Sequence, residues 1–367
     1  MFTTRNWCYL RARGVTLGLR PYTAGLNVLP FLTNLNKHIR SVEMRAKLTA
    51  VIGFLVFAFA GPVWADNYPS KVITLVVPFS AGGPTDTVAR MIAQPMSKTL
   101  GQTVIVENVG GAGGTIAAAR VARANPDGYT IFLHHIGQAT SATLYKNLTY
   151  SVLDDFETIG LVTPVPMTII ARKDFPAKDI KEFITYVKAN KDKITYGNAG
   201  IGAASHLCGM LFMSAIDTQF TTVSYKGTGP AMNDLLGGVF DFMCDQTTNT
   251  TGQIQAGKVK GYAVTSKKRV PSLKDLPTLQ ESGLKNFEVS VWHGLYAPKG
   301  TPKPIVDKIS AALRVALKDA SVKQRFADLG TEPEPADRAT PAAHRAHLKA
   351  EVEKWAPIIK QAGVYAD

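Results

Sequence analysis

Short β-branched apolar runs alternate with longer amphipathic segments along much of this chain. Residues 72–78 form an apolar run typical of a buried strand, and a glycine-containing turn follows them. A helix is predicted from Thr85, because apolar residues then recur on one face over residues 88–100. Strands are predicted again at residues 103–107 and 129–133. This strand–helix order predicts an α/β fold with a parallel sheet.

The same alternation resumes in the second half of the chain. Strands are predicted at residues 166–172, 194–198, 222–226, 239–244 and 262–265, and helices are predicted between consecutive strands as far as 239–244. The C-terminal part is helical: Thr301-Pro302 and Thr340-Pro341 each predict a helix start, with threonine as the N-cap and proline in the first turn. We therefore expect two α/β blocks, roughly residues 66–170 and 171–289, followed by helices.

A basic, then apolar, then small-residue segment precedes the first block. Met44 to Lys47 is basic, residues 48–60 are almost wholly apolar, and Val63-Trp64-Ala65 offers small residues where a signal peptidase cuts. We expect residues 44–65 to be a signal peptide that ends near Ala65. The alternative is an N-terminal membrane anchor, although the apolar run is short for a membrane span.

A signal peptide normally starts at the N-terminus, whereas here 43 residues precede Met44. We expect residues 1–43 to be a non-native or disordered extension, with Met44 as the true start. An unusually long basic region before the apolar run is the alternative. In both cases we expect the mature protein to begin near Asp66 and to be exported.

The bulk charge first suggests a nucleic-acid partner, because the chain carries a formal net charge of +13. The first 65 residues hold eight of the 41 Lys and Arg residues and only one of the 28 Asp and Glu residues. The rest of the chain therefore carries a formal net charge of +6. No run of basic residues with interleaved aromatics is present, so we expect no nucleic-acid binding. A mildly basic surface suits an anionic ligand.

The three cysteines, Cys8, Cys208 and Cys244, form no C-x-x-C pair. Zinc and dithiol redox sites are therefore disfavoured, and no metal or cofactor is predicted. A Cys208–Cys244 disulfide and two separate buried thiols both fit the sequence.

Two glycine-rich loops share one position, between a strand and a helix start. They are residues 78–86 and 197–206, one in each α/β block. Backbone N–H groups at a helix N-terminus, with the helix dipole behind them, bind anions, and glycine lets a ligand approach the backbone. We expect the two loops to face each other across a cleft. Asp245, which ends an apolar strand, is either a cap or a cleft carboxylate that accepts a hydrogen bond from the ligand.

Other candidate motifs support catalysis or nucleotide binding poorly. In the glycine cluster at residues 110–114, Ile116 stands where a dinucleotide fingerprint needs its third glycine. No nucleophile elbow surrounds Ser205, and His134-His135 lacks the spacing of a metal site on a strand. We therefore expect a binding protein and not an enzyme.

Several stretches, in order, resemble the tripartite tricarboxylate transporter substrate-binding receptors, the Bug family. They are PFSAGGPTDTVAR (78–90), GQTVIVENVGGAGGTIAAARVARANPDGYT (101–130), LYKNLTY (144–150) with the DDF that follows, YGNAGIGAASHL (196–207), VSYKGTGPAMNDLLGG (223–238) and AVTSKKRVPSLKDLPTLQESG (263–283). The resemblance implies a two-domain periplasmic-binding-protein fold (Venus flytrap, type II) with a cleft between domains. Domain 1 would comprise residues 67–170 and 291–367, and domain 2 residues 171–290.

The resemblance also implies a ligand, a partner and a set of site residues. The protein would capture a small organic carboxylate and deliver it, as a monomer, to the permease subunits of a membrane transporter; a sensory receptor with a signalling partner is the alternative. Residues 141–143 depart from an Asn-Pro pair common in the family, and His135 just upstream is expected to shape the far wall. The ligand-binding residues carried over are Phe79, Ser80, Ala81, Gly82, Gly83, Asp86, His135, Gly200, Gly202, Ala203, Ser205, Tyr225, Lys226, Gly227 and Asp245.

Overall fold

The structure is a computed structural model that describes residues 68–363, 365 and 366. These residues belong to one compact unit, Trp64–Asp367, and only this unit is described below. The expected signal peptide at 44–65, the extension at 1–43 and Cys8 lie outside the described residues. No helix within the described part of the chain is long and apolar enough to cross a membrane.

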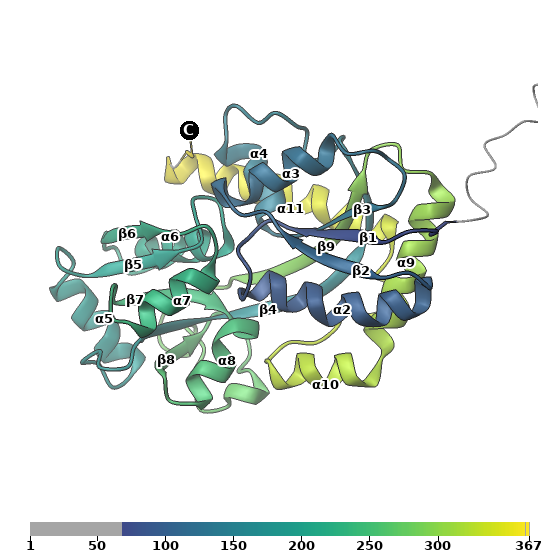
Figure 1. Cartoon of the computed structure of the whole chain (residues 1–367). Coiled ribbons are helices and arrows are strands. Elements are labelled where there is room, and N and C mark those ends of the chain that lie inside the picture. The colour runs from purple at the N-terminus through teal and green to yellow at the C-terminus, as the bar shows by residue number, and fades with distance from the viewer. Residues whose placement is uncertain (1–67, 364, 367) are drawn as a thin grey trace, which may run out of the picture. The chain divides into compact units, whose positions relative to one another are not determined.

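The first lobe is built on a mixed sheet in the order β2-β1-β3-β9-β4 (Figure 1). Its strands are β1 (Ile73–Val77), β2 (Val104–Asn108), β3 (Thr130–His135), β4 (Phe156–Arg172) and β9 (Ser290–Pro298). β1 pairs in parallel with β2 and β3, whereas β9 lies antiparallel between β3 and β4. The expectation of a parallel sheet is right for the first three strands and wrong for β9. Sequence periodicity did not reveal β9, because its position depends on pairing with strands more than 100 residues away in the chain.

The second lobe continues the sheet with β7, β5 and β6, while β8 pairs with β4. The strands are β5 (Thr195–Asn198), β6 (Thr221–Ser224), β7 (Phe242–Gln246) and β8 (Val259–Val264). β5 is parallel to β6 and β7, and β4 is antiparallel to β7 and β8. Each parallel pair places its strand ends at one edge, which is where a ligand site forms in such sheets.

One long strand, β4, belongs to both lobes. It pairs with β9 up to Pro166 and with β7 and β8 from Met167 onward. The chain thus enters the second lobe along β4 and returns to the first just before β9. The residue boundaries 67–170 with 291–367, and 171–290, stay predictions.

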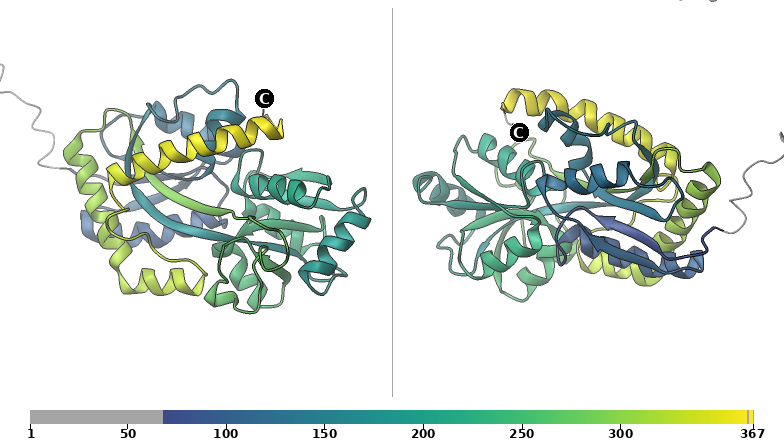
Figure 2. Two further views of the ribbon diagram at one scale, coloured as in Figure 1. Left: turned by 180° about the vertical axis from the view of Figure 1, so that it is seen from behind. Right: turned by 45° about the horizontal axis from the view of Figure 1, so that its top comes forward.

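Helices cover both lobes, and Figure 2 shows the long α11 lying across the first. α11 packs on α4 and β4, and α2 packs on α9. Thr340 caps α11 as predicted, but α9 has Pro302 as its N-cap, and the Thr301 hydroxyl instead bonds the carbonyl of Pro298 at 2.7 Å. The helices are α2 (Pro84–Leu100), α3 (Thr115–Ala122), α4 (Gly137–Leu144), α5 (Ile180–Ala189), α6 (Ala204–Ala215), α7 (Thr228–Leu236), α8 (Thr247–Gln255), α9 (Lys303–Lys318), α10 (Ala320–Asp328) and α11 (Pro341–Ala362).

Candidate functional site

The first glycine loop joins β1 to α2 and is held by Asp86. One oxygen of this carboxylate accepts the Gly82 N–H and the Arg90 Nε–H, each at 3.0 Å, and the other accepts the Asn108 amide at 3.0 Å. Burial alone would raise the pKa of Asp86, but these hydrogen bonds outweigh it and lower the pKa. Gly82 has φ +80°, a left-handed conformation that favours glycine. Asp86 therefore shapes the loop from behind.

The second glycine loop joins β5 to α6 and is held in a similar way. The Ser205 hydroxyl accepts the Ala199 N–H at 2.8 Å, and Gly202 N–H donates to His206 Nδ1 at 3.3 Å. Burial lowers the pKa of His206 to about 4, so its ring is neutral and accepts this bond at neutral pH. Gly200 and Gly202 have φ +106° and +83°. His206 is thus a structural histidine of the loop.

The two lobes meet at these loops. The Ser80 N–H donates to the carbonyl of Lys226 at 3.1 Å, and the Tyr145 hydroxyl donates to the carbonyl of Ile201 at 2.9 Å. A Cβ at Gly227 would lie 2.9 Å from the Ser80 nitrogen, so the close approach requires glycine there. Because lobe-to-lobe contacts flank the cleft, the structure is in a closed arrangement.

A small cavity of about 10 Å³ lies between the lobes, with room for about one water molecule. It is lined where helices begin: Pro84 and Thr85 start α2, Ala204 starts α6, Thr228 starts α7 and Gln246 caps α8. Each helix N-terminus carries about half a positive charge. Four such ends therefore favour an anion, although no Lys or Arg is among the residues that line this cavity.

The structure brings five of the predicted site residues to the cavity wall: Phe79, His135, Ala203, Ser205 and Asp245. The other predicted residues do not line the cavity. Asp86 lies in the first turn of α2, and the rest lie in the loops beside the wall: Ser80, Ala81, Gly82, Gly83, Gly200, Gly202, Tyr225, Lys226 and Gly227. Tyr225 in particular donates its hydroxyl to Asp234 at 2.7 Å.

Six lining residues were missed from the sequence: Pro84, Thr85, Ala199, Ala204, Thr228 and Gln246. Each of them stands next to, or one residue away from, a predicted residue. The rule that the first residues of a helix face the anion would have found Thr85, Ala204 and Thr228.

Asp245 is the acidic group of the cavity and is 1% exposed. One of its oxygens accepts the Asn249 amide at 2.6 Å, while the other has no hydrogen-bond partner among the described residues. Burial raises the pKa of Asp245 to about 7, and interactions with Asn249, the Gln246 N–H and the Thr228 hydroxyl oppose that rise only in part. The side-chain amide oxygen Oε1 of the neighbouring Gln246 is also unpartnered within the described chain. These two acceptors require a donor from a ligand or from water.

One buried histidine, His135, is part of the wall contributed by the first lobe. His135 stacks on Phe79 with ring centroids 4.8 Å apart, and the Gly137 N–H donates to its Nδ1 at 2.9 Å. Burial lowers the pKa of His135 to about 3, so the ring is neutral and carries its proton on Nε2. His293 approaches Thr85 at 3.4 Å. Among residues 68–363, no cluster of His, Cys, Asp and Glu could hold a metal ion.

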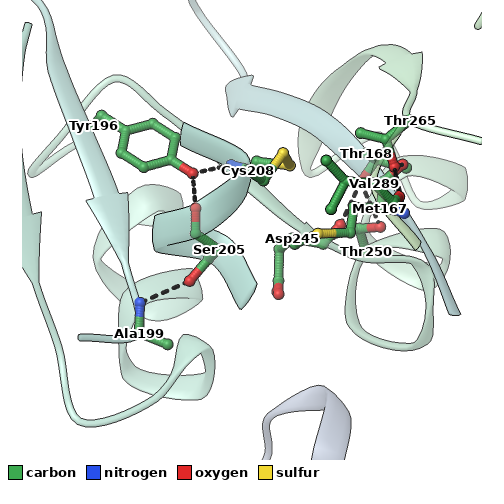
Figure 3. Close-up of a disulfide and its surroundings, with 11 residues drawn as sticks. Met167, Thr168, Tyr196, Ala199, Ser205, Cys208, Asp245, Thr250, Thr265 and Val289 are labelled. Carbon is green, nitrogen blue, oxygen red and sulfur yellow. Dashed lines mark hydrogen bonds between the residues drawn. A yellow bond between two sulfur atoms is a disulfide. The ribbon is translucent and has the colours of Figure 1, made fainter. Parts of the chain in front are cut away.

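A disulfide joins the two parts of the site contributed by the second lobe (Figure 3). It links Cys208 in α6 to Cys244 in β7, with Cα atoms 6.1 Å apart, and so decides the pairing that the sequence left open. The Tyr196 hydroxyl accepts the Cys244 N–H at 3.3 Å and donates to the carbonyl of Ser205. The start of α6 and the strand end at Asp245 are thereby tied together.

Comparison with known proteins identifies relatives over most of the chain. A family model described as "Tripartite tricarboxylate transporter family receptor" matches residues 88–364. A protein of Agrobacterium vitis, described as a UPF0065 protein in the TAR-I ttuE-ttuC' intergenic region, is 57% identical over 298 residues, which cover 81% of this chain and 86% of that protein.

Solved structures resemble this fold closely. The periplasmic binding protein BugD is 58% identical and superposes with a TM-score of 0.80, covering 81% of this chain and 99% of BugD. MatC from Rhodopseudomonas palustris, solved with bound malate, is 41% identical with a TM-score of 0.77, covering 80% of this chain and all of MatC. These neighbours are two-domain periplasmic binding proteins, as the sequence predicted for this fold.

Proposed function

Because this chain belongs to the tripartite tricarboxylate transporter receptor family, we propose that it captures a small organic carboxylate and delivers it to membrane permease subunits. The family consists of periplasmic solute-binding receptors, so this protein is a periplasmic solute-binding receptor. In our proposal the signal peptide is cut near Ala65 and the mature receptor works as a monomer.

The convergence of four helix N-termini on one closed cavity is the observation that carries the proposal. Helix ends α2, α6, α7 and α8 surround a space that no basic side chain lines. An anion held there is bound by backbone N–H groups and aligned dipoles, which already point inward before the ligand arrives. The cavity has room for about one water molecule as it stands, so the lobes must open to admit a carboxylate.

The second half of the ligand is proposed to meet Asp245, Gln246 and His135. Unpartnered oxygens of Asp245 and Gln246 need a hydrogen-bond donor, which a hydroxyl or ammonium group supplies. The Nε2–H of neutral His135 can donate to a further oxygen of the ligand. A hydroxy or amino carboxylic acid satisfies all three groups. The malate bound to MatC is a hydroxy acid.

Titration calorimetry against a panel of acids tests the proposal directly. The panel is L-malate, succinate, citrate, adipate, L-aspartate and benzoate, each also tested by thermal shift. We expect heat and a raised melting temperature with at least one acid, because a ligand that binds only the folded protein stabilises it. The absence of both heat and a melting-temperature shift with every acid of the panel would contradict ligand capture.

Asp245 gives this site a predicted pH dependence. A hydrogen-bond donor on the ligand favours the ionised carboxylate of Asp245. At a pH where Asp245 is protonated, ligand binding must therefore release that proton. With a pKa of about 7, affinity for L-malate should rise about tenfold from pH 6 to pH 8. Asp245→Asn should remove this dependence. Calorimetry at pH 6, 7 and 8 measures it.

The matched control is Asp217→Asn, because Asp217 is an exposed carboxylate just beyond the C-terminal end of α6. This variant should keep the pH dependence of the unmodified protein. His135 and His206 remain neutral from pH 6 to 8, so their titration adds nothing in this range. An L-malate affinity that stays flat from pH 6 to 8 in the unmodified protein would exclude this role for Asp245.

A further inference from the structure

We propose that the Thr265 hydroxyl links the two segments by which the chain crosses between the lobes, at Met167 in β4 and at Val289 before β9. This link positions both halves of the site. This inference rests on the proposed function, because ligand capture needs the lobes to close in one defined arrangement. Thr265 directly follows β8 and is fully buried. It lies outside the cavity wall and cannot act by touching the ligand.

The hydroxyl of Thr265 bonds to both crossing segments at once. It accepts the N–H of Met167, where β4 changes its partners, at 3.0 Å. It donates to the carbonyl of Val289, immediately before β9, at 2.6 Å. One oxygen atom thus joins the outgoing and the returning segments, which Figure 3 draws together.

The backbone of Thr265 reinforces the same two links. Its N–H donates to the carbonyl of Met167 at 2.9 Å, and its carbonyl accepts the N–H of Val289 at 3.2 Å. Backbone bonds survive substitution of the side chain, so the hydroxyl can be removed without removing every connection. The contribution of the hydroxyl is therefore open to measurement.

β4 changes its neighbours at this crossing, which gives the hydroxyl its importance. Its pairing with β9 ends at Pro166 and Ser290, and its pairing with β8 begins at Thr168 and Val264. Thr265 and Val289 therefore lie where one ladder ends and the other begins. Motions between lobes bend the chain at a few residues at the ends of elements. Thr265 joins Met167 to Val289 at this point.

Thr265→Val removes the hydroxyl and keeps the shape of the side chain, whereas Thr265→Ser keeps the hydroxyl. Thr168→Val is the matched control. Thr168 is also fully buried next to Met167, but its hydroxyl bonds Thr250 at 2.8 Å and the carbonyl of Asp245 at 3.1 Å, both within the second lobe. Both valine variants lose a buried hydroxyl, but only one loses a link between the crossings.

The deciding measurement is the distance distribution between spin labels on the two lobes, attached at Lys188→Cys and Lys318→Cys, which replace exposed residues of α5 and α9. We expect a broader distribution for Thr265→Val, with and without L-malate. Thr265→Ser and Thr168→Val should match the unmodified protein. A lower melting temperature with an unchanged distribution for Thr265→Val would overturn the proposal and leave Thr265 a purely structural role.

Ligand affinity supplies the second measurement. Thr265→Val should weaken L-malate binding roughly tenfold, the loss expected for one or two buried hydrogen bonds made in the closed arrangement. Thr265→Ser should restore it. If the unmodified protein binds no acid of the panel, the proposed function fails, while the label distances still decide the role of Thr265.

Discussion

Gly202→Asp abolishes ligand capture while the protein stays folded: this is the largest effect that we expect on binding. Gly202 lies in the second glycine loop with φ +83°, and a Cβ there would come within 3.3 Å of Tyr145 and 3.4 Å of Leu144 in the first lobe. A side chain at this position therefore meets the opposite lobe as the cleft closes. The added carboxylate also brings negative charge to the site where the ligand carboxylate is proposed to bind.

The charge alone accounts for a large loss. Two unit charges about 6 Å apart repel by about 3 kcal/mol at an effective dielectric constant of about 20. That energy corresponds to roughly a hundredfold loss of affinity. Calorimetry with the acids that bind the unmodified protein measures the loss, and circular dichroism checks the fold.

Gly238→Asp is the matched control for this substitution. Gly238 follows α7 with φ +72°, is exposed, and has open space where a Cβ would stand. The control therefore introduces the same charge and the same left-handed strain away from the cleft. It should bind as the unmodified protein does. Retained affinity in Gly202→Asp would refute the role of the second loop as a clamp.

Removal of the Cys208–Cys244 disulfide should have the largest effect on stability. The bond closes a segment with a sequence separation of 36 residues. In the chain-entropy model, a closed loop of that length stabilises the fold by about 4 kcal/mol. We expect the double variant Cys208→Ala with Cys244→Ala to lose about this much free energy of unfolding, as measured by urea denaturation.

A reductant provides the control for the disulfide prediction. Dithiothreitol should destabilise the unmodified protein towards the level of the double variant, and it should leave the double variant unchanged. Equal free energies of unfolding for the unmodified protein and the double variant would contradict the prediction. Because the disulfide also ties α6 to the strand that ends at Asp245, ligand affinity should fall with it.

Local sequence patterns predicted many of the elements that build the site. β-branched runs located β1 and β5. The glycine loop and helix predicted after each strand located α2 and α6, whose first residues line the cavity. These signals are local, since they arise from side-chain periodicity and from the backbone freedom of glycine. The same loops carried the family resemblance, which the comparisons confirmed.

Other elements had no such local signal. α8 has the sequence TTNTTGQIQ, with neither an apolar stripe nor strong helix formers, so it depends on the packing of its buried threonines. α4 was missed for a similar reason, because few of its buried residues are large and apolar. β9 is decided by pairing with β3 and β4, which no pattern of period two encodes.

The sequence by itself determined that two glycine loops stand at two helix starts, one in each α/β block. Only the tertiary structure decided that four helix ends converge on one cavity, that Cys208 pairs with Cys244, and that Thr265 lies between Met167 and Val289. It also decided the chemistry of Asp245, whose pKa rises because burial penalises its charge. Burial and the convergence of distant segments depend on the whole fold, whereas loop and helix signals are written in adjacent residues.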